Sequence, residues 1–469
     1  MSLVTCRGRA TRLLLNHAVC SPSPARKAKG LTKHDVTANA RPAAQTCRPS
    51  ERLSRHRDGQ PFFYLADTVW MAFPNLTLDE WARYLAQRRL QGFNALQISI
   101  LPVTHDTSMS PQNIDPFLPD ADGNWDFSAY NEAYFAKAET MVEMAVDQGF
   151  TPVLGVLWCS YAPGTRCSEH SPVASAMPFD AVAPFAAFAA ERFKRFNPIF
   201  FISGDTRFES PQEAPYYMAA LAAVRAVCPD ALLTMHLHPQ GDLPREFIDA
   251  VDFYMYQSGH DANTQHQPYT FAEKFAAYAV KRPVLNSEPP YEGHGRIGTR
   301  TRFNAFDIRK ATWQSLLSGA KMGITYGAHG VWSCHKRGMN FLNAHRSFEP
   351  FTWEEALLLD GSWDVGFARW LFERYNLFAT DPTAIVLGED KEIRAAASAD
   401  LATIAIYSPY AFDIDVAVDL TGYRCVLIDL ATRRVMTPEV QASERSRIGM
   451  SRVNADTLFL AVKQPISES

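Results

Sequence analysis

The segment PFFYLADTVWMAFPNLTLDEWARYLAQRRLQGFNALQISI, residues 61–100, contains one strand, one helix and a second strand in succession. Its apolar runs at 62–66 and 93–100 are typical of buried strands. The helical pattern between them begins after Thr77, which with Glu80 three residues later predicts a capping box, and Gly92 marks its end. This pattern predicts two parallel strands joined by a right-handed helical crossover.

The same alternation continues along the chain as far as residue 326. The strand candidates are 62–66, 93–100, 150–158, 198–203, 231–237, 251–256, 283–287 and 323–326. Eight parallel strands separated by helices predict an α/β fold, a (β/α)8 TIM barrel. A doubly wound open sheet is the alternative, but no glycine-rich phosphate loop follows the first strand.

The character of the sequence changes after Leu377, where short alternating runs are separated by turn residues and no helical period is present. Such spacing is typical of a small antiparallel β-sandwich. We therefore expect a barrel catalytic domain at residues 55–381 and a C-terminal β-sandwich domain at residues 382–469.

Residues 1–54 precede the barrel pattern, and we expect them to form a disordered basic extension. Nine Lys or Arg residues and one acid within residues 1–50 give this segment a charge of +8. Arg-rich, acid-poor segments also resemble organelle transit peptides. The apolar run Leu13–Leu15 is too short for a secretory signal. The compartment therefore stays open, with the cytoplasm favoured.

Composition narrows the class of protein. A net charge of −4 gives no general attraction to nucleic acid or to an anionic membrane. The apolar run Tyr216–Val224 is far shorter than the ~20 residues that a membrane span needs. The eight cysteines form no CxxC pair, so neither a structural zinc site nor a redox motif is indicated. We predict no metal and no cofactor, and the oligomeric state is not indicated.

Two acids follow predicted strands at the end of the barrel where active sites lie. Asp205 follows Ser203 and Gly204 after the fourth strand, and Glu288 directly follows the seventh. A single acid in such a place is often a helix cap or a salt-bridge partner. Two of them suit glycoside hydrolysis, which needs one carboxyl group to protonate the leaving oxygen and another to attack or to activate water.

The other strand ends carry aromatic, amide and histidine side chains, which suit the stacking and hydrogen bonding of a neutral carbohydrate. The candidate substrate-binding residues are Asp67, Trp70, Gln97, Trp158, His236, Tyr256, Tyr291, Tyr326, His329 and Trp332. Asp67 could equally cap the turn after the first strand, and the aromatic residues could equally pack in the core. A carbohydrate substrate is the partner that these residues predict.

Several blocks of the sequence resemble one known family in the same order. They are PFFYLADTVW (61–70), LTLDEWARYLAQRRLQGFNALQ (76–97), NPIFFISGD (197–205), RPVLNSEPPYEG (282–293) and ITYGAHGVW (324–332). They resemble the apiosidase-like catalytic domain, the hallmark of glycoside hydrolase family 140. The C-terminal part resembles the collagen-binding-type domain that often follows it.

The resemblance implies a retaining glycosidase that acts on plant cell-wall or pectic-type glycans. Asp205 would then be the general acid/base and Glu288 the nucleophile. One alternative is a metal-dependent hydrolase that uses His236 and His238, which point to the same side of a strand. The other is a non-catalytic glycan-binding barrel, against which the presence of both acids argues.

Overall fold

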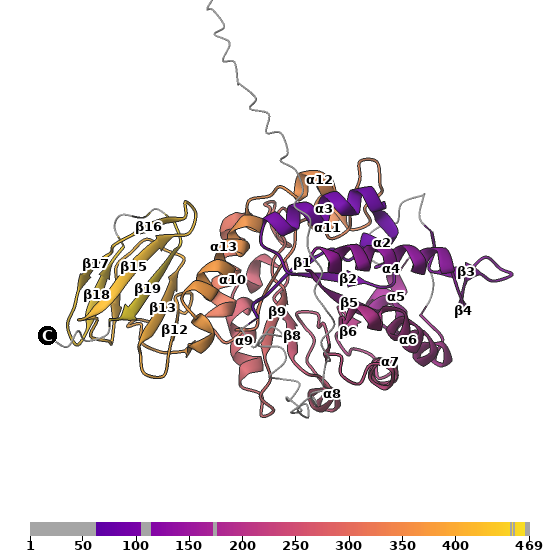
Figure 1. The fold of residues 1–469 in the computed structure, drawn as a ribbon, viewed down its shortest axis with the longest axis horizontal. Coiled ribbons are helices and arrows are strands. Elements are labelled where there is room, and N and C mark those ends of the chain that lie inside the picture. The colour runs from indigo at the N-terminus through magenta and orange to yellow at the C-terminus, as the bar shows by residue number, and fades with distance from the viewer. Residues whose placement is uncertain (1–61, 105–113, 172–175, 451–452, 454, 465–469) are drawn as a thin grey trace, which may run out of the picture. The chain divides into compact units, whose positions relative to one another are not determined.

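The computed structural model describes residues 62–104, 114–171, 176–450, 453 and 455–464, and it contains an eight-stranded parallel sheet surrounded by helices (Figure 1). The predicted extension at residues 1–54 lies outside the described residues. The sheet order is β7-β6-β5-β2-β1-β10-β9-β8. Its strands are β1 (Tyr64–Thr68), β2 (Ala95–Ser99), β5 (Thr151–Trp158), β6 (Ile199–Gly204), β7 (Leu233–Thr234), β8 (Tyr254–Gln257), β9 (Val284–Glu288) and β10 (Gly323–Tyr326). Each overlaps a predicted strand, so the barrel prediction is confirmed.

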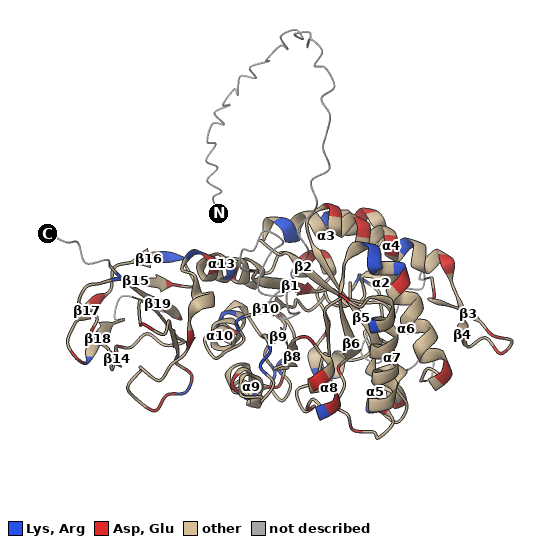
Figure 2. Ribbon diagram, turned by 60° about the horizontal axis from the view of Figure 1, so that its bottom comes forward, with Lys and Arg blue, Asp and Glu red and all other residues tan. Residues whose placement is uncertain are grey.

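The helices that follow the strands cover the outside of the barrel. The charged residues of the protein lie mainly on these helices and on the outer loops rather than on the strands (Figure 2). They are α3 (Leu78–Leu90), α4 (Glu132–Asp147), α6 (Phe179–Phe193), α7 (Glu213–Val227), α8 (Arg245–Ala250), α9 (Gln267–Ala276), α10 (Ala305–Leu316) and α13 (Gly361–Arg374). The predicted capping box is present at α3, where Thr77 accepts from the Glu80 backbone and donates its own backbone N–H to the Glu80 carboxylate. Among the described residues, no helix combines the length and apolar character of a membrane span.

The barrel closes between β7 and β8, the two strands at opposite ends of the sheet order. Asp252 N donates to Leu233 O at 2.8 Å, and Leu233 N donates back to the Asp252 carboxylate at 2.8 Å. The Thr234 hydroxyl donates to Phe253 O, also at 2.8 Å. Side chains therefore replace part of the backbone ladder at this seam.

Short elements within the long loops are not indicated by the sequence pattern. They are α2 (Ala72–Asn75), β3 (Phe117–Pro119), β4 (Trp125–Tyr130), α5 (Arg166–His170), α11 (Ala344–Ser347) and α12 (Trp353–Ala356). Helices of four or five residues complete little more than one turn, so they show no hydrophobic period.

The C-terminal part contains two antiparallel sheets that share an apolar core. One has the order β11-β12-β13-β19-β15-β16 and the other β14-β18-β17. Their strands are β11 (Asp381–Pro382), β12 (Arg394–Ala397), β13 (Thr403–Ser408), β14 (Ile414–Val416), β15 (Tyr423–Asp429), β16 (Arg434–Met436), β17 (Glu439–Gln441), β18 (Ser446–Gly449) and β19 (Thr457–Lys463). Ile404 and Phe459 of the first sheet and Ile448 of the second belong to that core.

Candidate active site

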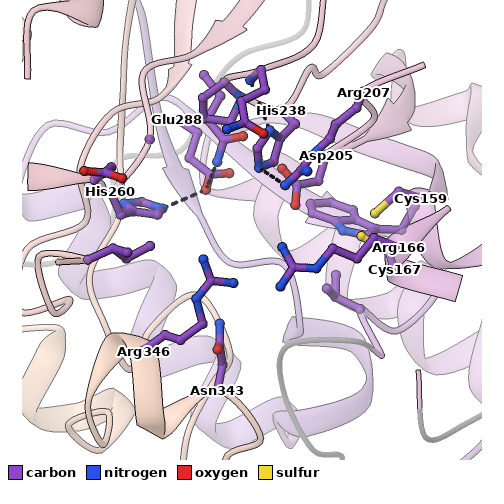
Figure 3. A pocket seen from close by; sticks show the side chains of 18 of the residues that line it. Cys159, Arg166, Cys167, Asp205, Arg207, His238, His260, Glu288, Asn343 and Arg346 are labelled. Carbon is purple, nitrogen blue, oxygen red and sulfur yellow. Dashed lines mark hydrogen bonds and ion pairs between the residues drawn. The ribbon is translucent and has the colours of Figure 1, made fainter. Parts of the chain in front are cut away.

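A cavity of about 710 Å³ lies among the loops that follow the carboxyl ends of the strands. Both predicted catalytic acids line it, and Figure 3 shows Asp205 and Glu288 directed into the same space. Four of the predicted sugar-binding residues also line it: Trp70, Trp158, Tyr291 and Trp332. The structure therefore brings six residues, chosen from five separate stretches of sequence, to one site.

Glu288 is the last residue of β9, and its side chain is held by three donors. His236 Nε2 lies 3.1 Å from Oε2, while His260 Nε2 at 3.0 Å and Gln257 Nε2 at 2.6 Å reach Oε1. Burial alone would raise the pKa of Glu288, but the hydrogen bonds and charges of His236 and His260 outweigh it and lower this pKa. The carboxylate is therefore ionised and fixed in orientation.

Asp205 directly follows β6 and has a left-handed backbone, with φ of 58°. The residue before it, Gly204, has no room for a side chain, because a Cβ there would lie 2.1 Å from the Trp158 ring. The strand thus ends in close contact with an aromatic wall, and the chain turns sharply at Asp205. This turn directs the Asp205 carboxyl group into the cavity (Figure 3).

His238 and Arg207 lie beside Asp205 in the cavity lining. Arg207 Nη2 is 2.8 Å from His238 Nε2. Burial lowers the pKa of His238, while the charges of Asp205 and Arg207 act on it in opposite directions. A neutral imidazole next to a guanidinium is therefore expected here at neutral pH.

Aromatic rings form one wall of the cavity. Trp70 Nε1 donates to the Tyr291 hydroxyl at 2.9 Å, and the rings of Trp70 and Trp158 lie edge to face with centroids 5.1 Å apart. Burial raises the pKa of Tyr291 well above its usual value, and the charge of Glu288 raises it further. The phenol therefore keeps its proton beside the carboxylate.

Two predicted binding residues, Asp67 and Gln97, are instead fully buried. The Asp67 carboxylate accepts from Tyr84 Oη at 2.7 Å and from Arg88 Nε at 2.6 Å, and both ionic groups are fully buried. Gln97 accepts from the Tyr64 hydroxyl at 2.9 Å and donates to Ser287 O at 3.1 Å. Neither side chain is in the cavity lining.

Four more predicted residues are buried and do not belong to the cavity lining. Tyr256 donates to Pro268 O at 2.7 Å, and His329 Nε2 lies 2.9 Å from Phe348 O. Tyr326 donates to the Glu292 carboxylate at 2.7 Å. His236 binds Glu288 and the Ser287 hydroxyl.

The sequence pattern did not indicate the cationic side of the cavity. Arg166 in α5 and Arg346 in α11 are exposed, and their guanidinium groups extend into the cavity from the side opposite Glu288 (Figure 3). Both belong to short helices without a period. An arginine in such a loop carries no local signal of where it points.

His236 and His238 do not converge on one ion position. His236 contacts Glu288 and Ser287, whereas His238 contacts the Arg207 guanidinium. Within the described part of the chain, neither belongs to a group of three ligand atoms close enough to hold one ion. The metal-dependent alternative therefore finds no support in the geometry of this pair.

Known proteins share both the sequence pattern and the fold. The family model for the apiosidase-like catalytic domain matches residues 49–379. One solved structure, described as a glycoside hydrolase, is 20% identical with a TM-score of 0.71, over 90% of this chain and 99% of that chain. A glycoside hydrolase family 5 protein from Bacteroides vulgatus is 19% identical with a TM-score of 0.72, over 89% of this chain and 95% of that chain. No curated protein matches the sequence.

Proposed function

Since this chain belongs to the apiosidase-like family and is a glycoside hydrolase, we propose that it is a retaining enzyme that acts on acidic, pectic-type cell-wall glycans. The observation that carries the proposal is the pair Asp205 and Glu288 at the carboxyl ends of β6 and β9, both lining one cavity. Retaining hydrolysis needs a carboxylate that attacks the anomeric carbon and a second carboxyl group that first donates and then accepts a proton.

Glu288 suits the attacking role. Its lowered pKa keeps it ionised at working pH, which a nucleophile requires. Its two oxygens are held by His236, His260 and Gln257, so attack costs little further ordering. The protonated Tyr291 phenol beside it can stabilise charge as the glycosyl–enzyme bond forms and breaks.

Asp205 suits the acid/base role because its carboxyl group is directed into the cavity that Glu288 also lines. The other acids of the lining have structural contacts. Glu213 accepts from the Thr206 hydroxyl and from Ser210 N, and Glu209 accepts from Arg166 N. Asp261 caps the turn at Asn263. Asp205 is therefore our choice for the group that protonates the leaving oxygen and later deprotonates water.

The cationic side of the cavity supports an acidic sugar. The exposed guanidinium groups of Arg166 and Arg346 extend into the space that faces Glu288. A guanidinium pairs with a carboxylate through two parallel hydrogen bonds, so a uronic acid unit fits here better than a neutral sugar. The Trp70 and Trp158 wall would then stack against the C–H face of the ring that is cleaved.

The test begins with a screen against aryl glycosides and pectic oligosaccharides, in acidic and methyl-esterified forms. We expect NMR of the first product to show the retained anomer. Asp205→Ala should still turn over an activated aryl glycoside, and azide should accelerate it by intercepting the glycosyl–enzyme. An inverted first product would contradict the retaining assignment.

The preference for an acidic substrate is tested separately, by comparing acidic and methyl-esterified substrates. Arg346→Ala should raise KM for the acidic substrate about tenfold or more, since a charged hydrogen bond is worth about 1.5–3 kcal/mol. The same variant should leave KM for the methyl-esterified substrate within about twofold. An equal change for both substrates would contradict the acidic-sugar assignment while leaving the hydrolase assignment intact.

A further inference from the structure

Three potential metal ligands converge on the side of the cavity that Asp205 occupies. The Sγ atoms of Cys159 and Cys167 and a carboxylate oxygen of Asp205 all lie within 4.8 Å of one another. Figure 3 shows both sulfur atoms next to Asp205. Within the described residues, this is the one group of three His, Cys, Asp or Glu side chains that has such spacing.

The backbone around the cluster is fixed by its own hydrogen bonds. The Thr165 hydroxyl donates to Cys159 O at 2.8 Å and forms a capping box with Ser168 at the start of α5. Arg166 N donates to the Glu209 carboxylate at 2.8 Å, which connects α5 to the loop after Asp205. The cysteine on α5 is thereby held against the one that follows β5, so binding an ion would require little ordering of the loops.

The donor set is that of a thiophilic cation. Zinc binds sulfur at about 2.3 Å and carboxylate oxygen at about 2.0–2.2 Å, so the ligand atoms of a tetrahedral site lie about 3.3–3.8 Å apart. The observed spacing needs only small side-chain movements to reach these values. Both thiols would release their protons to solvent on binding, and a water from the cavity would complete the tetrahedron.

The surrounding charges agree with such a site. Two thiolates and one carboxylate exceed the charge of a divalent cation by one. Arg207 and Arg166, which line the same part of the cavity, offset that excess. Sulfur ligands select zinc-like ions over magnesium and calcium, which prefer oxygen.

We propose that Cys159, Cys167 and Asp205 form a site for one thiophilic divalent cation of the zinc type, and that the bound cation inhibits the enzyme. The inhibition rests on the proposed function, because a carboxylate that coordinates a cation can neither donate nor accept the proton of the glycosidic oxygen. The site itself needs no assumption about the substrate.

Cobalt(II) is the probe for the site, since its spectrum reports both ligand type and geometry. We expect the full chain, kept reduced with a phosphine, to give thiolate-to-cobalt charge-transfer absorption that saturates at one equivalent. Cys159→Ser and Cys167→Ser should each weaken binding tenfold or more, and Asp205→Asn should weaken it while keeping the charge-transfer bands. Cys228 is a half-buried cysteine outside the cluster, and its thiol contacts Ala190 O. The control variant Cys228→Ser should therefore bind cobalt as the wild type does.

Two results would overturn the site: no thiolate-to-cobalt band in the wild type, or equal cobalt binding by Cys167→Ser and Cys228→Ser at matched melting temperatures.

Inhibition of the enzyme by the bound cation is tested separately. Micromolar Zn²⁺ should inhibit the wild type and Cys228→Ser reversibly, with a chelator restoring activity, and each variant is compared with its own metal-free rate. A normal cobalt spectrum without zinc inhibition would overturn the link to Asp205, whereas an enzyme without glycosidase activity would leave the cobalt result standing.

Discussion

Glu288 and Glu292 lie four residues apart in one segment, and both are nearly fully buried, with 6% and 5% of their surface exposed. Their ionisation nevertheless differs. The pKa of Glu288 is lowered, because two histidines outweigh its burial. The pKa of Glu292 is raised to about 7, because burial dominates and its donors are the neutral Tyr326 hydroxyl and Gly361 N.

For these two carboxyl groups, the partners rather than the depth of burial set the direction of the pKa shift. Both groups accept short hydrogen bonds, but only Glu288 has donors, His236 and His260, that can carry a charge and so favour the ionised form. Glu288 is suited to the proposed role of nucleophile. Glu292 instead connects β10 to the start of α13 through Tyr326 and Gly361.

The largest expected effect is on kcat, and it distinguishes Glu288 from Glu292. Glu288→Gln should lower kcat by about 10⁴-fold or more, since it removes the proposed nucleophile. Glu292→Gln is the matched control at the neighbouring position and should keep kcat within about threefold. The measurement is the initial rate on the best aryl glycoside. Comparable losses in both variants would mean that the two carboxyl groups do not differ in role.

Next in size is the pH dependence of stability that Glu292 causes. Its pKa is raised from 4.5 to about 7, so the folded state binds a proton more tightly than the unfolded state and stability falls as pH rises between these values. The cost at pH 8 is about 3 kcal/mol. Glu292→Gln keeps an acceptor for Tyr326 and Gly361 without the charge.

Urea unfolding of both proteins at pH 5 and at pH 8 measures this effect. The free energy of unfolding of Glu292→Gln, relative to the wild type, should increase between the two pH values. A difference that does not change with pH would show that Glu292 is ionised in the fold like an ordinary surface acid.

A smaller effect on activity is expected when Glu288 loses one hydrogen-bond donor that can carry a charge. His260→Phe keeps the ring that packs against His294, with centroids 4.4 Å apart, and removes the bond from Nε2. The pKa of Glu288 should rise, so the acidic limb of the kcat/KM profile should move to higher pH. The loss at the optimum should be about 10- to 100-fold, the equivalent of one charged hydrogen bond.

His266→Phe at an exposed position serves as the control for that profile. Its acidic limb should coincide with that of the wild type. If His260→Phe lowers activity without moving the limb, His260 positions the substrate rather than setting the ionisation of Glu288.

The smallest effect concerns Tyr326, a predicted sugar-binding residue that lies in the interior. Tyr326→Phe removes one neutral donor from Glu292 and should lower stability by about 1 kcal/mol, more at pH 8 than at pH 5. KM should not change. An increase in KM at unchanged stability would restore Tyr326 to the substrate site.

The strands and the two acids were predictable because their signals are local. Apolar runs, the Thr77 capping box and the position of Asp205 after β6 can be read within a few residues of sequence. The same reasoning could not separate the cavity lining from the interior, because both contain polar side chains near strand ends. Asp67 and Tyr326 face partners on other elements, Arg88 and Glu292, which the local sequence does not reveal.

The loops were the least predictable part. Arg166 reaches the cavity because Thr165 binds Cys159 O and Arg166 N binds Glu209, contacts between three different loop segments. Glu292 likewise depends on Gly361, which is 69 residues away. Contacts of this kind appear only once the strands have brought the loops together.

The seam between β7 and β8 has a consequence for how the barrel exchanges its amide protons with solvent. β7 has only two residues, and its closure depends on the Asp252 carboxylate and on the Thr234 hydroxyl. Local opening there breaks few bonds, so the amides of Leu233 and Asp252 should exchange deuterium by sub-global fluctuations. Amides in β2 and β5, paired on both sides, should exchange only through global unfolding. The seam between β7 and β8 should therefore open more readily than the paired strands in the rest of the barrel.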